Sequence, residues 1–301
     1  MNGQAIDNPP KKVLVMGSAI LDVIVTLPSL PKSGEDVFAK RTESFVGGCA
    51  YNVANIVKRY GVDYDLMVPV GKGPNGRKIH EQLVEDGHSL MIKDNEEDNG
   101  WCLSIVEEGG ERTFITVPGL ENHWKSEWFD NIRINAYDYI YLSGYVFEGH
   151  SASVVLEGLK RKGKEAKIIF DPSPRAPYLD EDQLHCLFRL NTIVHCNVSE
   201  LAALTGTNEI KEGVCRLNKL TSEPVIVTMG GEGTFYFTDD GFGECKEAPV
   251  TPVDTIGAGD AHMGGFIAGL VAGKSIGEAC HWGNMIARKI VQVRGGRLPN
   301  K

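Results

Sequence analysis

The chain has 301 residues, of which 42% are hydrophobic and 24% are charged, an ordinary composition for a globular protein. This length suffices for one large α/β domain with a modest appendage, or for two domains. The net charge of −9 and the lack of a basic stripe argue against a nucleic-acid partner.

The first twelve residues are polar and lack the apolar core of a signal peptide. No stretch is long enough to span a bilayer. Seven cysteines are scattered without a CxxC pair, and an odd count without a secretory signal favours reduced thiols. We therefore expect a cytoplasmic protein with no membrane partner and no structural zinc.

An acidic residue interrupts the first apolar segments. Residues 13–16 form a short apolar run that predicts a buried parallel strand, and residues 20–25 resume it with Asp22 embedded. Because an unpaired charge is not buried without cost, Asp22 is either exposed beyond a strand end or hydrogen-bonded to a ligand.

Two alternating segments predict a small second sheet. Residues 36–45 and 101–117 alternate in polarity, and residues 108–111 predict a hairpin turn in the second segment. Both flank a helical pattern and interrupt an α/β alternation. We therefore expect a separate sheet, built from about residues 23–46 and 99–118, that acts as a lid.

Gly47 and Gly48 precede a helix that extends to about Tyr60 and ends at Gly61. Such a pair either makes a turn or lets the backbone approach a ligand closely. Asn52, on the first turn, carries both a donor and an acceptor. The Gly-rich segment 71–78 lacks the Gly-Lys-Ser/Thr ending of a P-loop and contains Pro74, so we interpret it as a turn before a helix over 77–86.

The second half alternates strands and helices. We predict strands at 139–142, 167–170, 192–195 and 224–228, and helices at 151–162, 181–189 and 200–205. Such units give a parallel sheet with helices on both faces, and ligands bind beyond the carboxyl ends of its strands. Asp171, Asn197, Thr228 and the loop 254–260 all follow strands or extended segments, which predicts one shared site.

Two groups at this edge have both a functional and a structural interpretation. Arg175 either pairs with phosphate or forms an ion pair with Asp171. Asn197 and Glu200 lie three residues apart, on one face if a helix begins there. They either position magnesium, with the carboxylate acting through water, or cap the helix.

The segment 254–272 places Gly257, Ala258 and Gly259 directly before Asp260 and a helix rich in small residues. A turn of small residues at a helix start offers N–H donors and a positive dipole end to an anion. A carboxylate there either caps the helix or takes a proton from an attacking hydroxyl. We favour the second role. The nearby His262 is expected to pack or to face solvent.

The segments 45–54 and 254–272 resemble the two signatures of the PfkB/ribokinase-type carbohydrate kinases, and the resemblance covers nearly the whole chain. Among the members, uncharacterised bacterial sugar kinases are the most similar, and they specify no substrate. The resemblance implies a ribokinase-like three-layer α/β fold with a mostly parallel sheet and a β-sheet lid. It also implies transfer of the γ-phosphoryl group of ATP, with Mg²⁺, to a hydroxyl of a small sugar.

The resemblance also implies roles for individual residues. Asp260 would be the catalytic base. The other catalytic residues, Gly257, Ala258 and Gly259, would form the anion hole for the transferred phosphate. The acceptor would be held by Asp22, Gly47, Gly48, Asn52 and the lid residue Arg112. The nucleotide would be bound by Asn197, Thr228, Gly230, Gly233 and Arg175. As a lone pattern, Thr228–Gly233 would suit a tight hairpin equally well.

Metal ions and a second copy of the chain complete these expectations. Glu200 and Asn197 would position Mg²⁺. Asp254 and Ile256 would supply oxygens to K⁺, together with the tail segment 291–297. The lid is a candidate surface for a homodimer.

Three alternatives stay open. The acceptor is a nucleoside or pseudouridine, or it is a sugar phosphate recognised by a lid cation such as Lys40, Arg41 or Arg112. The third alternative is a catalytically silent regulator that binds sugar or nucleotide. Acceptor choice is expected to depend on lid side chains such as Asn99, Trp101 and Arg112.

Overall fold

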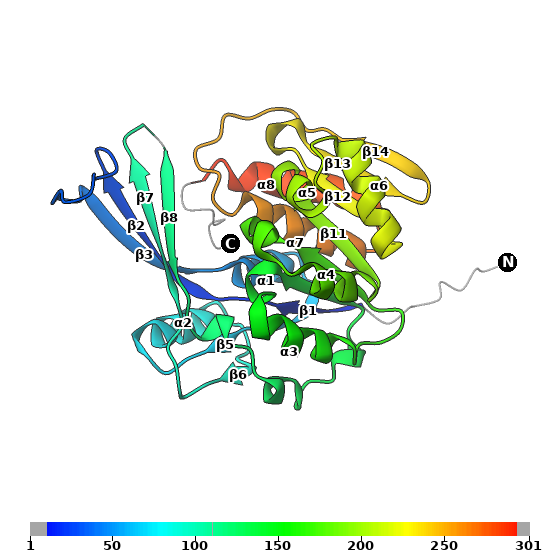
Figure 1. The fold of residues 1–301 in the computed structure, drawn as a ribbon, viewed down its shortest axis with the longest axis horizontal. Coiled ribbons are helices and arrows are strands. Elements are labelled where there is room, and N and C mark those ends of the chain that lie inside the picture. The colour runs from blue at the N-terminus through cyan, green and yellow to red at the C-terminus, as the bar shows by residue number, and fades with distance from the viewer. Residues whose placement is uncertain (1–10, 110, 294–301) are drawn as a thin grey trace.

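A computed structural model describes residues 11–109 and 111–293, and its largest element is an eight-stranded sheet (Figure 1). The strand order is β14-β13-β12-β11-β10-β9-β1-β4, and the pairs from β12 to β4 are parallel. Only β13 and β14 run antiparallel to their neighbours. The strands are β1 Lys12–Met16, β4 Asp63–Met67, β9 Tyr139–Ser143, β10 Lys167–Asp171, β11 Thr192–Asn197, β12 Val225–Thr228, β13 Thr234–Thr238 and β14 Gly241–Cys245.

Helices cover both faces of this sheet. Successive side chains of a strand point to opposite faces, so Leu14 and Met16 belong to one core and Val13 and Val15 to the other. The first core is closed by α3 Gly149–Leu159, α4 Glu181–Phe188, α5 Val198–Thr205 and α6 Ile210–Thr221. The second is closed by α1 Cys49–Arg59, α2 Pro74–Glu85, α7 Ala258–Val271 and α8 Ile276–Ile290. The expected three-layer α/β fold is confirmed.

Every strand and helix predicted for the second half is present, with shifted ends. Helix α2 begins at Pro74, three residues before the predicted start. Proline is tolerated at the first helical position because an N–H there would have no intrahelical acceptor in any case. The sequence analysis did not identify β4, α6, β13, β14 or α8. No helix within the described part of the chain is long and apolar enough to cross a membrane.

A four-stranded sheet stands apart from the main sheet, at the left of Figure 1. Its order is β3-β2-β7-β8, with β2–β7 parallel and the other two pairs antiparallel. Its strands are β2 Ile20–Leu27, β3 Arg41–Gly47, β7 Trp101–Glu107 and β8 Arg112–Val117. A two-stranded sheet pairs β5 Pro69–Val70 with β6 Ile92–Lys93. We call the four-stranded sheet the lid sheet.

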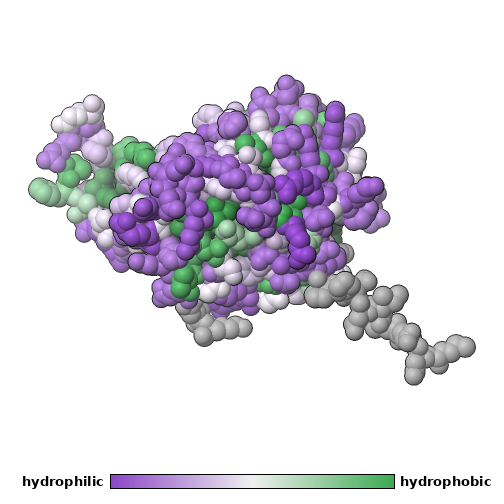
Figure 2. Space-filling model, turned by 90° about the horizontal axis from the view of Figure 1, so that it is seen from below, coloured by the Kyte–Doolittle hydropathy of each residue, from purple (hydrophilic) through white to green (hydrophobic). Residues whose placement is uncertain are grey.

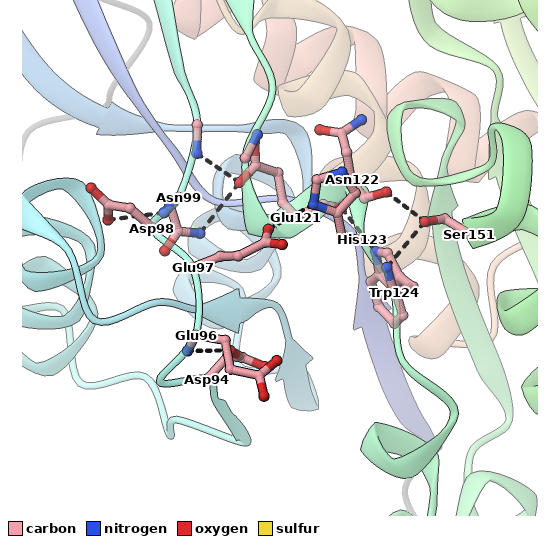
Figure 3. A network of polar contacts seen from close by, with 12 residues as sticks. Asp94, Glu96, Glu97, Asp98, Asn99, Glu121, Asn122, His123, Trp124 and Ser151 are labelled. Carbon is pink, nitrogen blue, oxygen red and sulfur yellow. Dashed lines mark hydrogen bonds and ion pairs between the residues drawn. The ribbon is translucent and has the colours of Figure 1, made fainter.

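Asn99, at the base of the lid sheet, is buried in a network of polar contacts (Figure 3). It is 3% exposed, its side-chain N–H groups donate to the carbonyl of Pro69 at 2.9 Å, and its Oδ1 accepts from the amide of Gly71 at 2.7 Å. Neighbouring Glu121 accepts from the amide of Gly100 at 2.9 Å. Asn99 thus satisfies backbone groups of neighbouring segments, and its influence on acceptor choice stays a prediction.

The small residues of α7 permit close packing against helices. A Cβ built at Gly264 would stand 2.5 Å from Cβ of Ile56 in α1, and one at Gly269 would stand 2.8 Å from Cα of Ala279 in α8. Glycine in a helix costs about 1 kcal/mol relative to alanine. Here the glycines let α1 and α8 pack closely against α7, and this packing fixes the position of the residues at its N-terminus.

Candidate active site

Three polar side chains end adjacent strands at one edge of the main sheet. Asp171, Asn197 and Thr228 are the last residues of β10, β11 and β12, and Asn197 pairs with Thr228 in the parallel register. Because neighbouring parallel strands end at the same edge, these side chains come together. The structure therefore places the predicted strand-end residues in one region.

A cavity of about 290 Å³ lies beyond these strand ends. Carboxylates from three elements line it, those of Asp171, Glu200 and Asp260, with Cys49 beside them. None of the described residues that line this cavity is Lys or Arg. The cavity is therefore strongly electronegative and suits a cation.

A second cavity, of about 440 Å³, adjoins the first. Residues Thr228 to Gly233 border it on one side, and Asn284, Ala287 and Arg288 of α8 on the other. Asn197, Thr228 and Gly259 line both cavities. The larger cavity falls in the size range of small-molecule sites, and the shared residues mark a boundary where two ligands can meet.

The predicted anion hole forms this boundary. Gly257 has φ 72°, in the left-handed region that favours glycine, and it is the N-cap of α7. The N–H of Ala258 makes a long bond of 3.3 Å to the carbonyl of Thr255. The amides of Gly259 and Asp260 belong to the first helical turn, where no intrahelical acceptor exists. This helix start can bind an anion that reaches in from either cavity.

Asp260 is held by α1, on the far side of the same boundary. Nδ2 of Asn52 donates to Oδ2 of Asp260 at 2.7 Å, although the two residues are 208 positions apart. The Cys49 thiol also bonds to this carboxylate. Burial raises the pKa of Asp260, against the lowering effect of the Asn52 and Cys49 bonds. Burial first, then Asp260 and Asp171, raises the pKa of Cys49, which therefore stays a neutral donor.

Asn197 and Glu200 form a helix cap, and they also line the electronegative cavity. The amide of Glu200 donates to Asn197 Oδ1 at 2.9 Å, and Glu200 Oε2 accepts from the amide of Asn197 at 2.8 Å. Burial, followed by the Glu200 and Asp260 charges, raises the pKa of Asp171. Burial likewise raises the pKa of Glu200. Asn197, Glu200 and Asp171 offer the oxygen donors that Mg²⁺ prefers, while among the described residues no three His, Cys, Asp or Glu side chains are arranged to hold an ion directly. The residues present therefore fit Mg²⁺ bound in part through water.

Of the predicted acceptor residues, Asn52 contacts Asp260, and none of them lines either cavity. Asp22 on β2 lies against Gly47 at the end of β3, where a Cβ would overlap its carboxylate oxygen Oδ2. Gly48 has φ 104°, and a Cβ there would stand 2.5 Å from the carbonyl oxygen of Ser18. Only glycine allows this approach. The chain then enters α1, which carries Asn52 to Asp260.

The segment Thr228–Gly233 is the connection of a hairpin and also borders the larger cavity. It joins β12 to the antiparallel β13, and the amide of Met229 donates to the carbonyl of Gly233 at 2.8 Å. A Cβ at Gly230 or Gly231 would meet nothing within 4 Å. The two interpretations offered by the sequence are therefore compatible.

Arg175 forms an ion pair with Glu148. Its Nε and Nη2 donate to the two carboxylate oxygens at 2.5 and 2.9 Å, and its guanidinium lies 4.3 Å from the ring centre of Tyr178. The alternative of a pair with Asp171 is wrong. Arg175 lines neither cavity.

Arg112 reaches from β8 to Asp254, and the two form an ion pair with Nη2 2.9 Å from Oδ1. The same oxygen accepts from the amide of Ile256 at 3.0 Å. The Arg112 guanidinium therefore pairs with the carboxylate that the resemblance assigned to K⁺. With this positive charge beside Asp254, the residues do not fit K⁺ at that carboxylate. Part of the tail in that prediction, residues 294–297, lies outside the described residues.

A buried polar chain, whose two histidines each line one of the cavities, was not identified from the sequence. His195 Nε2 and His262 Nδ1 lie 2.7 Å apart, and Thr234 Oγ1 lies 2.8 Å from His262 Nε2. Burial lowers the pKa of His195 to about 4. His262 is buried, so of the two environments expected for it, packing and solvent, the first is found. Cys49 was also missed, and its only signal was its place between Gly48 and Asn52.

A wider hollow of about 670 Å³ lies between residues 122–127 and the start of α3. Asn122, His123, Trp124 and Ser151, drawn in Figure 3, are among its lining residues. None of the predicted site residues borders it. The smaller pair of cavities, where the carboxylates and the helix start converge, is the better candidate site.

Comparison with known proteins agrees with this geometry. The family model described as pfkB family carbohydrate kinase matches residues 10–301. An uncharacterised sugar kinase of Escherichia coli, YegV, is 33% identical over 95% of this chain and 90% of its own length. A fructokinase of Klebsiella pneumoniae is 28% identical over 87% of this chain and 85% of its own.

Solved structures share the fold. A ribokinase of Arabidopsis thaliana in complex with ribose and ATP superposes with a TM-score of 0.79, at 26% identity over 95% of this chain and 94% of that chain. The chain belongs to the pfkB family of carbohydrate kinases and is an ATP-dependent phosphotransferase that acts on an alcohol group.

Proposed function

We propose that this kinase transfers the γ-phosphoryl group of ATP to a hydroxyl of a small, unphosphorylated sugar or sugar-like acceptor, with Asp260 as the general base. The observation that supports this most is the place of Asp260 and the turn Gly257–Gly259 at the boundary of two adjoining cavities. One cavity has the size and the glycine-rich border of a nucleotide site. The other is acidic and is lined by Asp260, whose carboxylate accepts a hydrogen bond from Asn52 of α1.

In this proposal Asp260 takes the proton of the attacking hydroxyl. A general base works best when its pKa is raised toward the working pH, and burial raises the pKa of Asp260. Asn52 donates to Oδ2 and the Cys49 thiol also bonds to this carboxylate, so the two bonds fix its orientation. The proton is then held in a site from which two ligands exclude water.

The amides at the start of α7 stabilise the charge on the transferred group. Gly259 and Asp260 present first-turn N–H groups, and the left-handed conformation of Gly257 directs the chain into this turn. Asn197 and Glu200, with Asp171 beside them, would hold Mg²⁺. When bound, that ion neutralises phosphate charge in a cavity that otherwise repels it.

The two substrates divide between the two sides of Asp260. Thr228, Gly230 and Gly233 border the larger cavity and are assigned to the phosphates and ribose of ATP. Asp22, Gly47, Gly48 and Asn52 are assigned to the acceptor. Asp22 supplies a charged acceptor of hydrogen bonds for sugar hydroxyls, and the two glycines allow the backbone to approach.

A sugar phosphate is disfavoured because the candidate lid cations already have acidic partners. Lys40 pairs with Glu108, and Arg41 pairs with Glu43. Arg112 pairs with Asp254. An acceptor phosphate would have to displace one of these carboxylates. The lid sheet therefore favours a neutral acceptor.

A screen of sugars, nucleosides and their phosphates with ATP and Mg²⁺, scored by ADP release, tests the proposal. We expect release with at least one neutral sugar and none with the corresponding sugar phosphate. Release confined to nucleosides would select the nucleoside alternative. Binding of sugar and ATP without ADP release would support the silent regulator and overturn the proposal.

The lid sheet also carries the surface that we assign to a homodimer. Phe38, in the loop between β2 and β3, is 94% exposed. On β8, Phe114 is 57% exposed, and Ile115 and Val117, which alternate with it and point to the other face, are also exposed. Figure 2 shows hydrophobic surface on the projecting lid sheet at the left. Apolar side chains gathered on one projecting element are typical of an interface, and a second copy would cover them.

A further inference from the structure

The carboxylate of Asp254 lies at the base of the loop that leads into the anion hole. Its side chain is 6% exposed. Oδ1 accepts from the amide of Ile256 at 3.0 Å, and the amide of Asp254 donates to the carbonyl of Val291 at 3.2 Å. The charge of Asp254 is therefore fixed three residues before Gly257.

Such a carboxylate needs a counter-charge if an anion is to bind nearby. A buried negative charge is costly alone, and it would repel the phosphoryl group that the same loop is to bind. A monovalent cation is one solution. The chain provides another, because Arg112 Nη2 lies 2.9 Å from Asp254 Oδ1.

Arg112 comes from the lid sheet, 142 positions away in the sequence. Its side chain is 24% exposed, and it extends from the first residue of β8 to the loop before α7. A guanidinium carries the same single charge as K⁺, and a second cation at this oxygen would be repelled by it.

We propose that Arg112 takes the place of a monovalent cation at Asp254, so that this kinase needs no K⁺ and completes its anion hole only when the lid sheet lies over the loop. The inference rests on the proposed function. It makes Arg112 a positioning residue that acts through Asp254. It also links the position of β8 to the catalytic turn.

The test compares the wild-type chain with Arg112→Gln and Arg112→Lys. Arg41→Met is the matched control, because Arg41 is also a lid-sheet arginine but pairs with Glu43 on its own strand. ADP release is measured with the best acceptor in KCl and in tetramethylammonium chloride at equal ionic strength. The midpoint of thermal unfolding is measured in the same two salts without substrates.

We expect ADP release by the wild type and by Arg41→Met not to depend on which of the two salts is present. Arg112→Lys should likewise be insensitive to the choice of salt, because it keeps the positive charge, whatever its own rate. Arg112→Gln should lose about tenfold or more of kcat/KM without K⁺, the cost of one charge-assisted bond, and should regain most of it in KCl. K⁺ should raise the unfolding midpoint of Arg112→Gln and leave that of the wild type unchanged.

Two results would overturn the inference. One is a wild-type chain that K⁺ activates or stabilises against unfolding. The other is an Arg112→Gln variant that folds but is neither reactivated nor stabilised by K⁺, which would assign Arg112 to the acceptor instead. If no variant releases ADP with any acceptor, the proposed function fails, while the unfolding midpoints still decide whether Arg112 replaces the cation.

Discussion

The contact between Gly47 and Asp22 provides a test of the acceptor site at a residue with no side chain of its own. A Cβ added at Gly47 would overlap Oδ2 of Asp22 and stand 3.0 Å from its Cγ. Carbon atoms that are not bonded to each other rest about 3.5–4.0 Å apart, so the carboxylate would have to move by about 1 Å in Gly47→Ala. The backbone of Gly47 itself needs no rearrangement, because its φ is not positive.

A shift of about 1 Å in a positioning group costs about 10²-fold in rate, which corresponds to about 2.7 kcal/mol. We therefore expect Gly47→Ala to lower kcat/KM for the acceptor by about 10²-fold while KM for ATP stays unchanged. Steady-state ADP release at varied acceptor and varied ATP separates the two effects. Gly109→Ala is the control, since a Cβ at Gly109, in the turn between β7 and β8, would meet nothing within 4 Å.

Asp22→Ala tests whether the effect passes through this carboxylate. If Gly47→Ala acts by displacing Asp22, the double variant should be no worse than Asp22→Ala alone, because both changes remove one interaction. Additive losses in the double variant, or an unchanged kcat/KM for the acceptor in a folded Gly47→Ala protein, would refute the reasoning.

Three further predictions concern the base, the buried histidines and the lid sheet. Asn52→Ala removes a donor that favours the charged form of Asp260, so the pKa of Asp260 should rise. The acidic limb of the pH profile of kcat/KM should then move to higher pH, and an unmoved limb would contradict the assignment of Asp260 as the base. His195 has a pKa of about 4 in the folded protein against 6.5 in the unfolded chain, so the stability it contributes above pH 6.5 is lost as the pH falls toward 4. The free energy of unfolding, measured in urea, should therefore fall less steeply with pH in His195→Gln than in the wild type, by up to about 1.4 kcal/mol per pH unit. If the free energy of unfolding depends on pH equally in the wild type and in His195→Gln, His195 does not make this contribution. Phe114→Asp should convert a lid-sheet dimer into a monomer in light scattering after gel filtration, and a wild-type monomer would remove the interface proposal.

The fold was largely predictable because its local signals agree with one another. The apolar runs before Asp171, Asn197 and Thr228 alternate with amphipathic segments, and this alternation gives a parallel sheet whose strand ends share an edge. The sequence showed that the helix after Asp260 is rich in small residues, but the partners of these residues, α1 and α8, follow only from the fold.

The side-chain pairs of the site were not predictable in the same way. Asn52 meets Asp260, Arg112 meets Asp254 and Arg175 meets Glu148, and these contacts depend on how distant elements pack. Spacing along one helix or strand carries no information about such pairs. A sequence pattern can therefore nominate Arg175 for phosphate, while the fold gives it a carboxylate partner.

The direct test of the central claim is turnover by Asp260→Asn, which keeps the shape of the side chain and removes the base. With the best acceptor from the screen, ADP release should fall by about 10²- to 10⁴-fold. The shift of the unfolding midpoint by ATP and Mg²⁺ should be retained, because the larger cavity is unchanged. Wild-type turnover in Asp260→Asn would contradict the assignment of this carboxylate as the base.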